Sequence, residues 1–185
     1  MTFCLWLTGL PGSGKTTILK ELSKLLSASG IEVIILSLDH IRKVVTPDPK
    51  YTYEERAIVY RSLVMMAKLL VQDGGRHVII DATGNRREFR ELARELIPDF
   101  VEIYVQCPLE LCEERESLRE GHPVQKNLYR NALKGTTVQE MPGISAPYEA
   151  PETPEVLIQS DIMSPGESAE KIMTYLRSRW PDQIS

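Results

Sequence analysis

Short apolar runs alternate along the chain with longer segments in which apolar residues recur at helical spacing. Apolar side chains on successive positions are typical of strands that are buried on both faces. The apolar runs are residues 3–8, 32–37, 77–82, 102–107 and 155–160. The helical segments are residues 15–29, 53–72, 86–96, 109–119 and 166–179. Ser164, Pro165 and Glu167 are the predicted N-cap, N1 and N3 residues of the last helix. This alternation predicts an α/β fold of three layers, in which helices cover both faces of a five-stranded parallel sheet.

One stretch breaks the alternation. Residues 120–154 are rich in glycine and proline and carry several basic side chains, with Arg119 directly before them. A long loop in a compact α/β domain is usually functional. We therefore predict a mobile lid at roughly 119–150, within a single domain that spans residues 1–185.

A phosphate-binding loop follows the first predicted strand. Residues 9–16 read GLPGSGKT and fit the pattern G-x-x-x-x-G-K-[ST] at every position, between a strand and a helix. In such a loop the backbone N–H groups converge on phosphate oxygens, the lysine reaches the β- and γ-phosphates, and the hydroxyl can bind Mg²⁺. The chain is therefore expected to bind ATP and Mg²⁺. The predicted ATP-binding residues are Gly9, Leu10, Pro11, Gly12, Ser13, Gly14, Lys15, Thr16 and Thr17.

Acidic residues lie where the second and third predicted strands end. Asp39 follows the second strand, and its carboxylate could take a proton from an attacking hydroxyl or help to hold Mg²⁺; alternatively, Asp39 caps a helix at 40–45. Asp81 ends the third strand and resembles the acidic residue that orders Mg²⁺ in P-loop proteins. The predicted metal ligands are Thr16, Asp39 and Asp81. The predicted catalytic residues are Lys15, Asp39 and Arg42. Arg42 is included because it lies three residues after Asp39, on the same side of a helical turn.

Arginines follow the third strand at helical spacing. Arg86, Arg90 and Arg94 recur every four residues and would share one helix face. A solvated face paired with Glu88, Glu91 and Glu95 is the simpler interpretation, and we prefer it for Arg94. Arg87 and Arg90 lie nearest the strand end, and we predict that they contact the substrate.

A GTPase is the first alternative, since residues 81–84 also spell D-x-x-G. The chain has no N-K-x-D segment for guanine recognition. The basic loop suits a lid that excludes water from a phosphotransfer reaction, so a kinase is preferred.

Composition narrows the class of protein. The chain has 22 Lys and Arg against 26 Asp and Glu, a net charge of −4, and no basic block, so a nucleic-acid partner is not expected. The three cysteines form no C-x-x-C pair, and the histidines lack metal-ligand spacing. No segment is apolar enough to predict a signal peptide or a membrane span, so we expect a cytoplasmic protein that does not bind membranes.

Several motifs together resemble the adenylylsulfate kinases. Residues 6–17 are similar to that family's P-loop, and LDHIR at 38–42 is similar to the end of its D-G-D-N-V-R segment. The other similar segments are YTYEER (51–56), PLELCEER (108–115), KNLYRNALKG (126–135) and PGISAPYEAPETPEV (142–156). The resemblance implies ATP- and Mg²⁺-dependent phosphorylation of the 3′-hydroxyl of adenylylsulfate, as in sulfate assimilation. Dimers are common in that family, so a homodimer is one expected assembly.

The resemblance also implies where a nucleotide substrate binds. The predicted substrate-binding residues are Asp39, Arg42, Tyr51, Arg56, Arg87, Arg90, Lys126, Met141 and Ile144. Tyr51 replaces one of the family's stacking phenylalanines, and Met141 replaces the other. Val59 and Gln139 stand where the family has a polar Asn and a Lys, so weaker substrate binding than in other members is expected.

Two other interpretations stay open. Residues 79–86, IIDATGNR, also resemble the polynucleotide-kinase-like and zeta-toxin-like phosphotransferases, in which a D-x-x-R after the second strand serves acid–base catalysis. Asp39 and Arg42 fit that pattern too, so the alternative is a related kinase for another nucleotide, a nucleotide-sugar or a small hydroxyl compound. The other open interpretation is a binding module that depends on a nucleotide but transfers no phosphoryl group.

Overall fold

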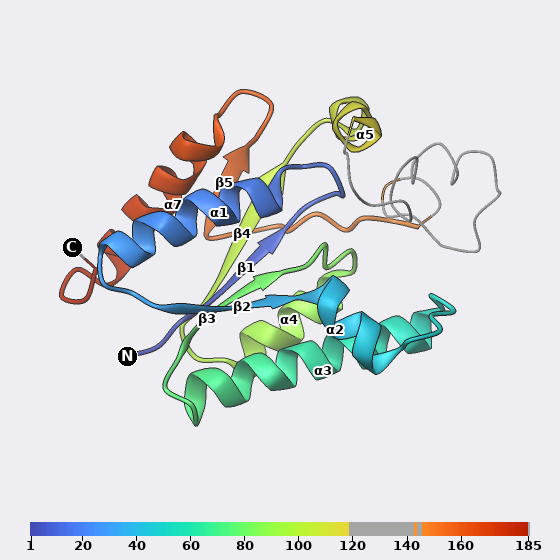
Figure 1. Cartoon of the computed structure of the whole chain (residues 1–185), viewed down its shortest axis with the longest axis horizontal. Coiled ribbons are helices and arrows are strands. Elements are labelled where there is room, and N and C mark those ends of the chain that lie inside the picture. Colours follow the sequence, from blue (N-terminus) through green and yellow to red (C-terminus); the bar gives the residue numbers. More distant parts are fainter. Residues whose placement is uncertain (119–142, 144–145, 185) are drawn as a thin grey trace.

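A parallel sheet of five strands, in the order β2-β3-β1-β4-β5, forms the centre of the molecule (Figure 1). The computed structural model describes residues 1–118, 143 and 146–184. The strands are β1 (Cys4–Thr8), β2 (Val33–Ser37), β3 (His77–Asp81), β4 (Phe100–Gln106) and β5 (Val156–Gln159). The helices are α1 (Lys15–Ala28), α2 (Leu38–Val45), α3 (Tyr53–Gln72), α4 (Arg87–Leu96), α5 (Leu109–Ser117) and α7 (Pro165–Arg179). The predicted three-layer α/β fold with five parallel strands is confirmed.

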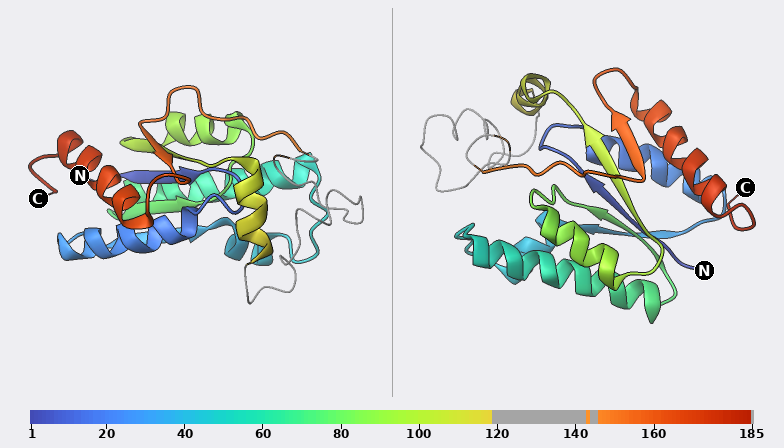
Figure 2. Two further views of the ribbon diagram at one scale, coloured as in Figure 1. Left: turned by 90° about the horizontal axis from the view of Figure 1, so that it is seen from above. Right: turned by 180° about the vertical axis from the view of Figure 1, so that it is seen from behind.

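The central strand β1 divides the core into two layers, because successive side chains of a strand point to opposite faces. Leu5 and Leu7 are fully buried in a cluster with α1 and α7. Cys4 and Trp6 are fully buried in a second cluster, with α3 and α4. Figures 1 and 2 show the two pairs of helices on opposite faces of the sheet. No helix among the described residues is both long and apolar enough to cross a membrane.

Helix starts follow the predicted capping residues at α7 but not at α2. Ser164 accepts a hydrogen bond from the Glu167 backbone N–H, and the Glu167 side chain accepts one from the Ser164 N–H, which confirms the predicted start of α7. Helix α2 begins earlier than expected, at Leu38 with Ser37 as its N-cap. Asp39 lies in the first turn, so the alternative interpretation of Asp39 as the cap residue is wrong. A carboxylate in a first turn still interacts favourably with the helix dipole.

The carboxyl ends of the three strands that carry predicted site residues lie side by side. β1 pairs with β3, and β3 pairs with β2, with Leu7 opposite Asp81 and Asp81 opposite Ser37. The P-loop, Asp81 and the start of α2 therefore meet at one edge of the sheet, where open α/β folds bind ligands. Both chain termini lie at the other end of the molecule (Figures 1 and 2).

Most of the predicted lid lies outside the described residues. Three of the predicted substrate contacts, Lys126, Met141 and Ile144, also lie outside the described residues. Residues 146–150 are described, and they run without helix or strand structure past the carboxyl ends of β1 and β3.

Candidate active site

The P-loop needs glycine because its backbone approaches neighbouring elements closely. Gly12 has φ +78°, and a Cβ added there would lie 2.3 Å from the carbonyl oxygen of Cys112 on α5. A Cβ on Gly9 would lie 2.4 Å from the carbonyl oxygen of Val105 on β4. Any larger residue would displace the loop from β4 and α5. The pattern of glycines in the sequence thus has a direct steric cause.

The side chain of Lys15 is buried over this loop. Its Nζ donates hydrogen bonds to the carbonyl oxygens of Gly9 and Leu10, both at 2.8 Å. Burial lowers the pKa of Lys15, whereas the negative charges of Asp81 and Asp39 act in the opposite direction. The loop therefore holds one ammonium group close to two acidic residues, which is the arrangement that binds a phosphate chain together with a divalent cation.

Thr16 and Asp81 form the candidate metal site. The Thr16 hydroxyl donates to Asp81 Oδ2 at 2.9 Å, although the two residues are 65 positions apart in sequence. Mg²⁺ prefers oxygen ligands and is usually held by one or two protein groups together with waters and substrate phosphates. Within the described residues, no group of three or more His, Cys, Asp or Glu side chains is placed to hold a metal. The hydroxyl–carboxylate pair beside the phosphate loop fits Mg²⁺.

Asp39 faces the same region from α2. It is solvent-exposed, and its charge acts on both Lys15 and the hydroxyl of Tyr60. Tyr60 in turn accepts a hydrogen bond from the Gly84 N–H at 3.0 Å, just after β3. The charge of Asp39 therefore acts on the same lysine as that of Asp81, and the catalytic role of Asp39 stays a prediction.

Three predicted acceptor residues form one cluster between α2 and α3. The guanidinium carbon of Arg42 lies 5.0 Å from the centre of the Tyr51 ring, and that of Arg56 lies 5.9 Å from it. Arg56 Nε also donates to the Tyr51 carbonyl at 3.1 Å. Tyr51 has φ +58°, a conformation that few residues other than glycine adopt, and such strain is often found at functional sites.

Sequence reasoning missed Glu55, which organises this cluster. Glu55 Oε1 accepts from Arg42 at 3.1 Å, and Oε2 accepts from the Lys50 backbone N–H at 2.5 Å. Both charged side chains of the Arg42–Glu55 pair are mostly buried, at 11% and 14% exposure. The only signal for this role is the position of Glu55 directly before Arg56.

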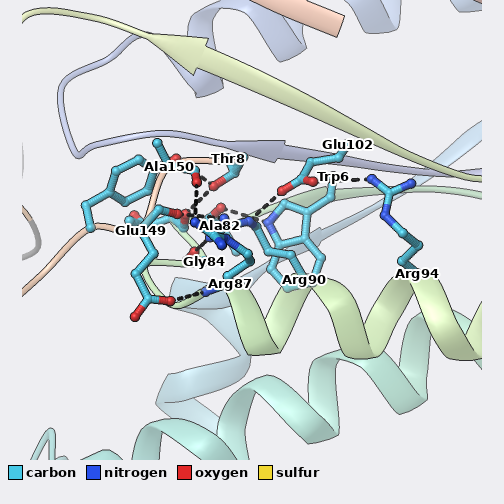
Figure 3. A network of polar contacts seen from close by, with 12 residues as sticks. Trp6, Thr8, Ala82, Gly84, Arg87, Arg90, Arg94, Glu102, Glu149 and Ala150 are labelled. Atoms are coloured by element: carbon cyan, nitrogen blue, oxygen red, sulfur yellow. Dashed lines mark hydrogen bonds and ion pairs between the residues drawn. The ribbon is translucent and has the colours of Figure 1, made fainter. Parts of the chain in front are cut away.

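The structure turns Arg90 away from any accessible site. Its side chain is 1% exposed, and it donates to Glu102 Oε1 at 2.5 Å and to the Glu149 carbonyl at 2.6 Å (Figure 3). It also donates to the Gly84 carbonyl. These bonds occupy all three guanidinium nitrogens. Arg90 thus stabilises the fold. The prediction that it contacts the substrate is not supported, because its guanidinium has no accessible donor.

The neighbouring arginines of α4 are also bonded to the protein. Arg87 donates from its guanidinium to Glu152 and to the Ala150 carbonyl, so it faces the end of the predicted lid and the residues directly after it. Arg94 pairs with Glu155 and with Glu102 at 3.3 Å. The prediction that Arg94 pairs with acidic residues of its own helix is therefore wrong, because its face of α4 lies against β4 and the start of β5.

Comparisons with known proteins agree with this geometry. A family model described as adenylylsulphate kinase matches residues 1–159. The adenylyl-sulfate kinase of Thermodesulfovibrio yellowstonii is 39% identical over 180 residues, which cover 96% of this chain and 85% of that protein. That of a Picosynechococcus strain is 39% identical over 171 residues, covering 92% of this chain and 91% of that one. A solved structure of a Mycobacterium tuberculosis APS kinase, in complex with AMPPNP and APS, superposes with a TM-score of 0.82 at 30% identity, covering 95% of this chain and 98% of that chain.

Proposed function

The chain belongs to the adenylylsulphate kinase family, and we propose that it transfers the γ-phosphoryl group of ATP to the 3′-hydroxyl of adenylylsulfate, giving 3′-phosphoadenylylsulfate. The observation that carries this proposal is the meeting of two halves at one sheet edge. The P-loop and the Thr16–Asp81 pair supply a donor site, and the cluster of Arg42, Tyr51 and Arg56 supplies the acceptor side.

On the donor side, the P-loop and Lys15 bind and orient the phosphate chain. The loop N–H groups and the Lys15 ammonium would stabilise the negative charge that builds up on the migrating phosphoryl group. Thr16 and Asp81 would hold Mg²⁺, which neutralises charge on the phosphates when it is bound. Lys15 is already held in the loop by two carbonyl oxygens, so little rearrangement precedes phosphate binding.

On the acceptor side, the proton of the attacking hydroxyl needs a base. We assign this role to Asp39, whose exposed carboxylate lies near Lys15. As the hydroxyl oxygen forms its bond to phosphorus, the proton moves to the Asp39 carboxylate and ADP leaves with the electron pair of the broken P–O bond. Arg42 and Arg56 supply cations for the anionic bridge of the acceptor, and the Tyr51 ring supplies a face for the base. Lys126, Met141 and Ile144 stay predicted contacts.

A related kinase for a different hydroxyl compound is the second candidate. The observation that favours it is Val59, which is fully buried in α3 at the position where the family has a substrate-binding Asn. A missing polar contact would weaken adenylylsulfate binding, by about 1–3 kcal/mol for each group left unpaired.

The deciding experiment compares acceptors directly. The protein is incubated with ATP, Mg²⁺ and a panel of hydroxyl compounds, and mass spectrometry reports which compound gains one phosphoryl group. Adenylylsulfate is also titrated onto the ADP–Mg²⁺ complex by calorimetry. Turnover of adenylylsulfate supports the proposal; absence of both heat and turnover at millimolar concentration, in protein that binds ATP, transfers the assignment to the second candidate.

A cytoplasmic location suits this activity and the state of the cysteines. Cys4, Cys107 and Cys112 are buried free thiols, as is typical of proteins in a reducing compartment. The homodimer stays a prediction, to be tested by light scattering.

A further inference from the structure

A hydrogen-bond chain connects the segment 146–150 to the strand that leads into the P-loop. The Tyr148 hydroxyl lies 3.0 Å from Thr8 Oγ1, and Thr8 Oγ1 lies 2.6 Å from the Thr83 carbonyl oxygen. A threonine hydroxyl has one hydrogen, and a carbonyl oxygen can only accept. Thr8 must therefore donate to Thr83 and accept from Tyr148, which gives the chain a single direction.

These hydrogen bonds lie beside the residues of the donor site. Thr8 is the fully buried last residue of β1 and is followed directly by Gly9 of the P-loop. Thr83 comes two residues after Asp81, the partner of Thr16. The pairing of β1 with β3 ends at Leu7 and Asp81, and the bond from Thr8 to Thr83 joins the two segments just beyond these last paired residues. This bond therefore connects the residue before the P-loop with the segment that follows Asp81.

The segment 146–150 is fixed on its other side by α4. Arg90, which is buried, donates to the Glu149 carbonyl, and the Arg87 backbone N–H donates to a Glu149 carboxylate oxygen at 2.8 Å (Figure 3). The Glu149 N–H donates to the Asn85 carbonyl at 2.8 Å. Tyr148 is thus held between α4 and β1 with little freedom to move, and the burial of its side chain raises the pKa of its hydroxyl, which therefore stays protonated as a donor.

We propose that Thr8 and Tyr148 are positioning residues for phosphotransfer, which through the Thr83 carbonyl fix the P-loop and Asp81 relative to each other. The identity of the phosphate acceptor in this inference rests on the proposed function, whereas the hydrogen bonds themselves do not depend on it. Neither is among the residues assigned above to bind substrate or Mg²⁺. Their effect arises because a displacement of about 1 Å in a reacting group can cost on the order of 10²-fold in rate.

The test is a double-mutant cycle with Tyr148→Phe and Thr8→Val, each of which removes a hydroxyl at nearly constant shape. We expect each change to lower kcat about 10-fold and to leave the KM for ATP within about 2-fold, as for a loss of positioning without loss of binding. The double variant should be no slower than the slower single variant, because both changes break one chain. Thr8→Ser keeps the hydroxyl and should restore most of kcat.

Tyr104→Phe is the matched control. Tyr104 lies opposite Thr8 on β4, its ring centre is 6.1 Å from that of Tyr148, and its hydroxyl makes no hydrogen bond to the described residues. It should keep the wild-type kcat. If Tyr148→Phe matches this control, or if the two rate losses multiply in the double variant, the proposal is overturned. If Thr8→Val does not fold, the comparison of Tyr148→Phe with Tyr104→Phe still decides.

Two assays separate this inference from the proposed function. Wild-type turnover of adenylylsulfate tests the function alone. The slow hydrolysis of ATP without acceptor tests the hydrogen-bond chain whatever the acceptor is, and Tyr148→Phe should slow it about as much as it slows transfer. Equal hydrolysis rates in the wild type and Tyr148→Phe would contradict the inference even where the proposed function holds.

Discussion

Replacing Arg90 by methionine decides whether this arginine holds the fold or the substrate. Arg90→Met removes the guanidinium and keeps much of the length of the side chain. Glu102, itself buried, then loses its partner at 2.5 Å, and among the described residues its side chain keeps the contact with Arg94 at 3.3 Å. The carbonyl oxygens of Gly84 and Glu149 each lose a donor.

The expected loss of stability is large. Breaking a buried ion pair by removing one partner costs roughly 3–5 kcal/mol, and the remaining contact with Arg94 places the loss near the lower value, about 3 kcal/mol. For a domain of this size that corresponds to a fall in Tm of roughly 6–12 °C. Urea unfolding followed by circular dichroism measures the loss. Arg90→Met combined with Glu102→Met removes both charges and should recover about 1–3 kcal/mol of it.

Kinetics on the folded fraction complete the test. The KM for the acceptor should stay near the wild-type value, because Arg90 has no donor facing an accessible site. If Arg90→Met keeps its stability within about 1 kcal/mol while the KM rises tenfold, Arg90 binds substrate and the structural explanation fails.

Three further substitutions test Lys15 of the donor site, the proposed base Asp39 and the ion pair of Glu155 with Arg94. Lys15→Ala should lower turnover by about 10²-fold or more with an unchanged circular dichroism spectrum, whereas Lys20→Ala, on the exposed face of α1, should keep full activity. Asp39→Asn should lower kcat by about 10²-fold at nearly unchanged Tm; a fall in Tm with surviving turnover would assign Asp39 to the helix dipole instead. Burial raises the pKa of Glu155, but the hydrogen bonds from Arg94 and from the Glu102 backbone N–H, together with the positive charge of Arg94, outweigh burial and hold that pKa below its ordinary value of 4.5. The contribution to stability is therefore fully present above pH 4.5 and is lost as the pH falls through the lowered pKa, so Glu155→Gln should lower Tm at pH 7 and differ little from the wild type in strong acid.

Secondary structure and the donor site could be predicted because their signals are local. The strand before the P-loop, the glycines and Lys15 lie within a dozen consecutive residues, although the atoms that leave no room for a Cβ at Gly9 and Gly12 belong to β4 and α5. The start of α7 was predictable for the same reason, since its capping box lies within four residues. The start of α2 was missed by two residues because Ser37 and Leu38 read equally well as the end of a strand.

The environment of α4 could not be predicted from its own residues. Arginines that recur every four positions indicate one helix face, but the period does not tell whether that face meets solvent or the sheet. The partners that decide the matter lie far away in sequence, since Glu102 belongs to β4 and Glu155 precedes β5. Only the arrangement of strands in space shows that Arg90 and Arg94 serve the fold.

The two halves of the site are therefore specified in different ways. The motif of the donor half lies in one short segment, so its chemistry is shared by P-loop kinases whatever they phosphorylate. The acceptor half depends on contacts between separate elements, such as the Arg42–Glu55 pair between α2 and α3. A change of acceptor within this fold thus requires changes in α2 and α3, whereas the P-loop can stay the same. For this reason the sequence identifies the phosphate donor site more firmly than the acceptor, and the acceptor panel is the more informative experiment.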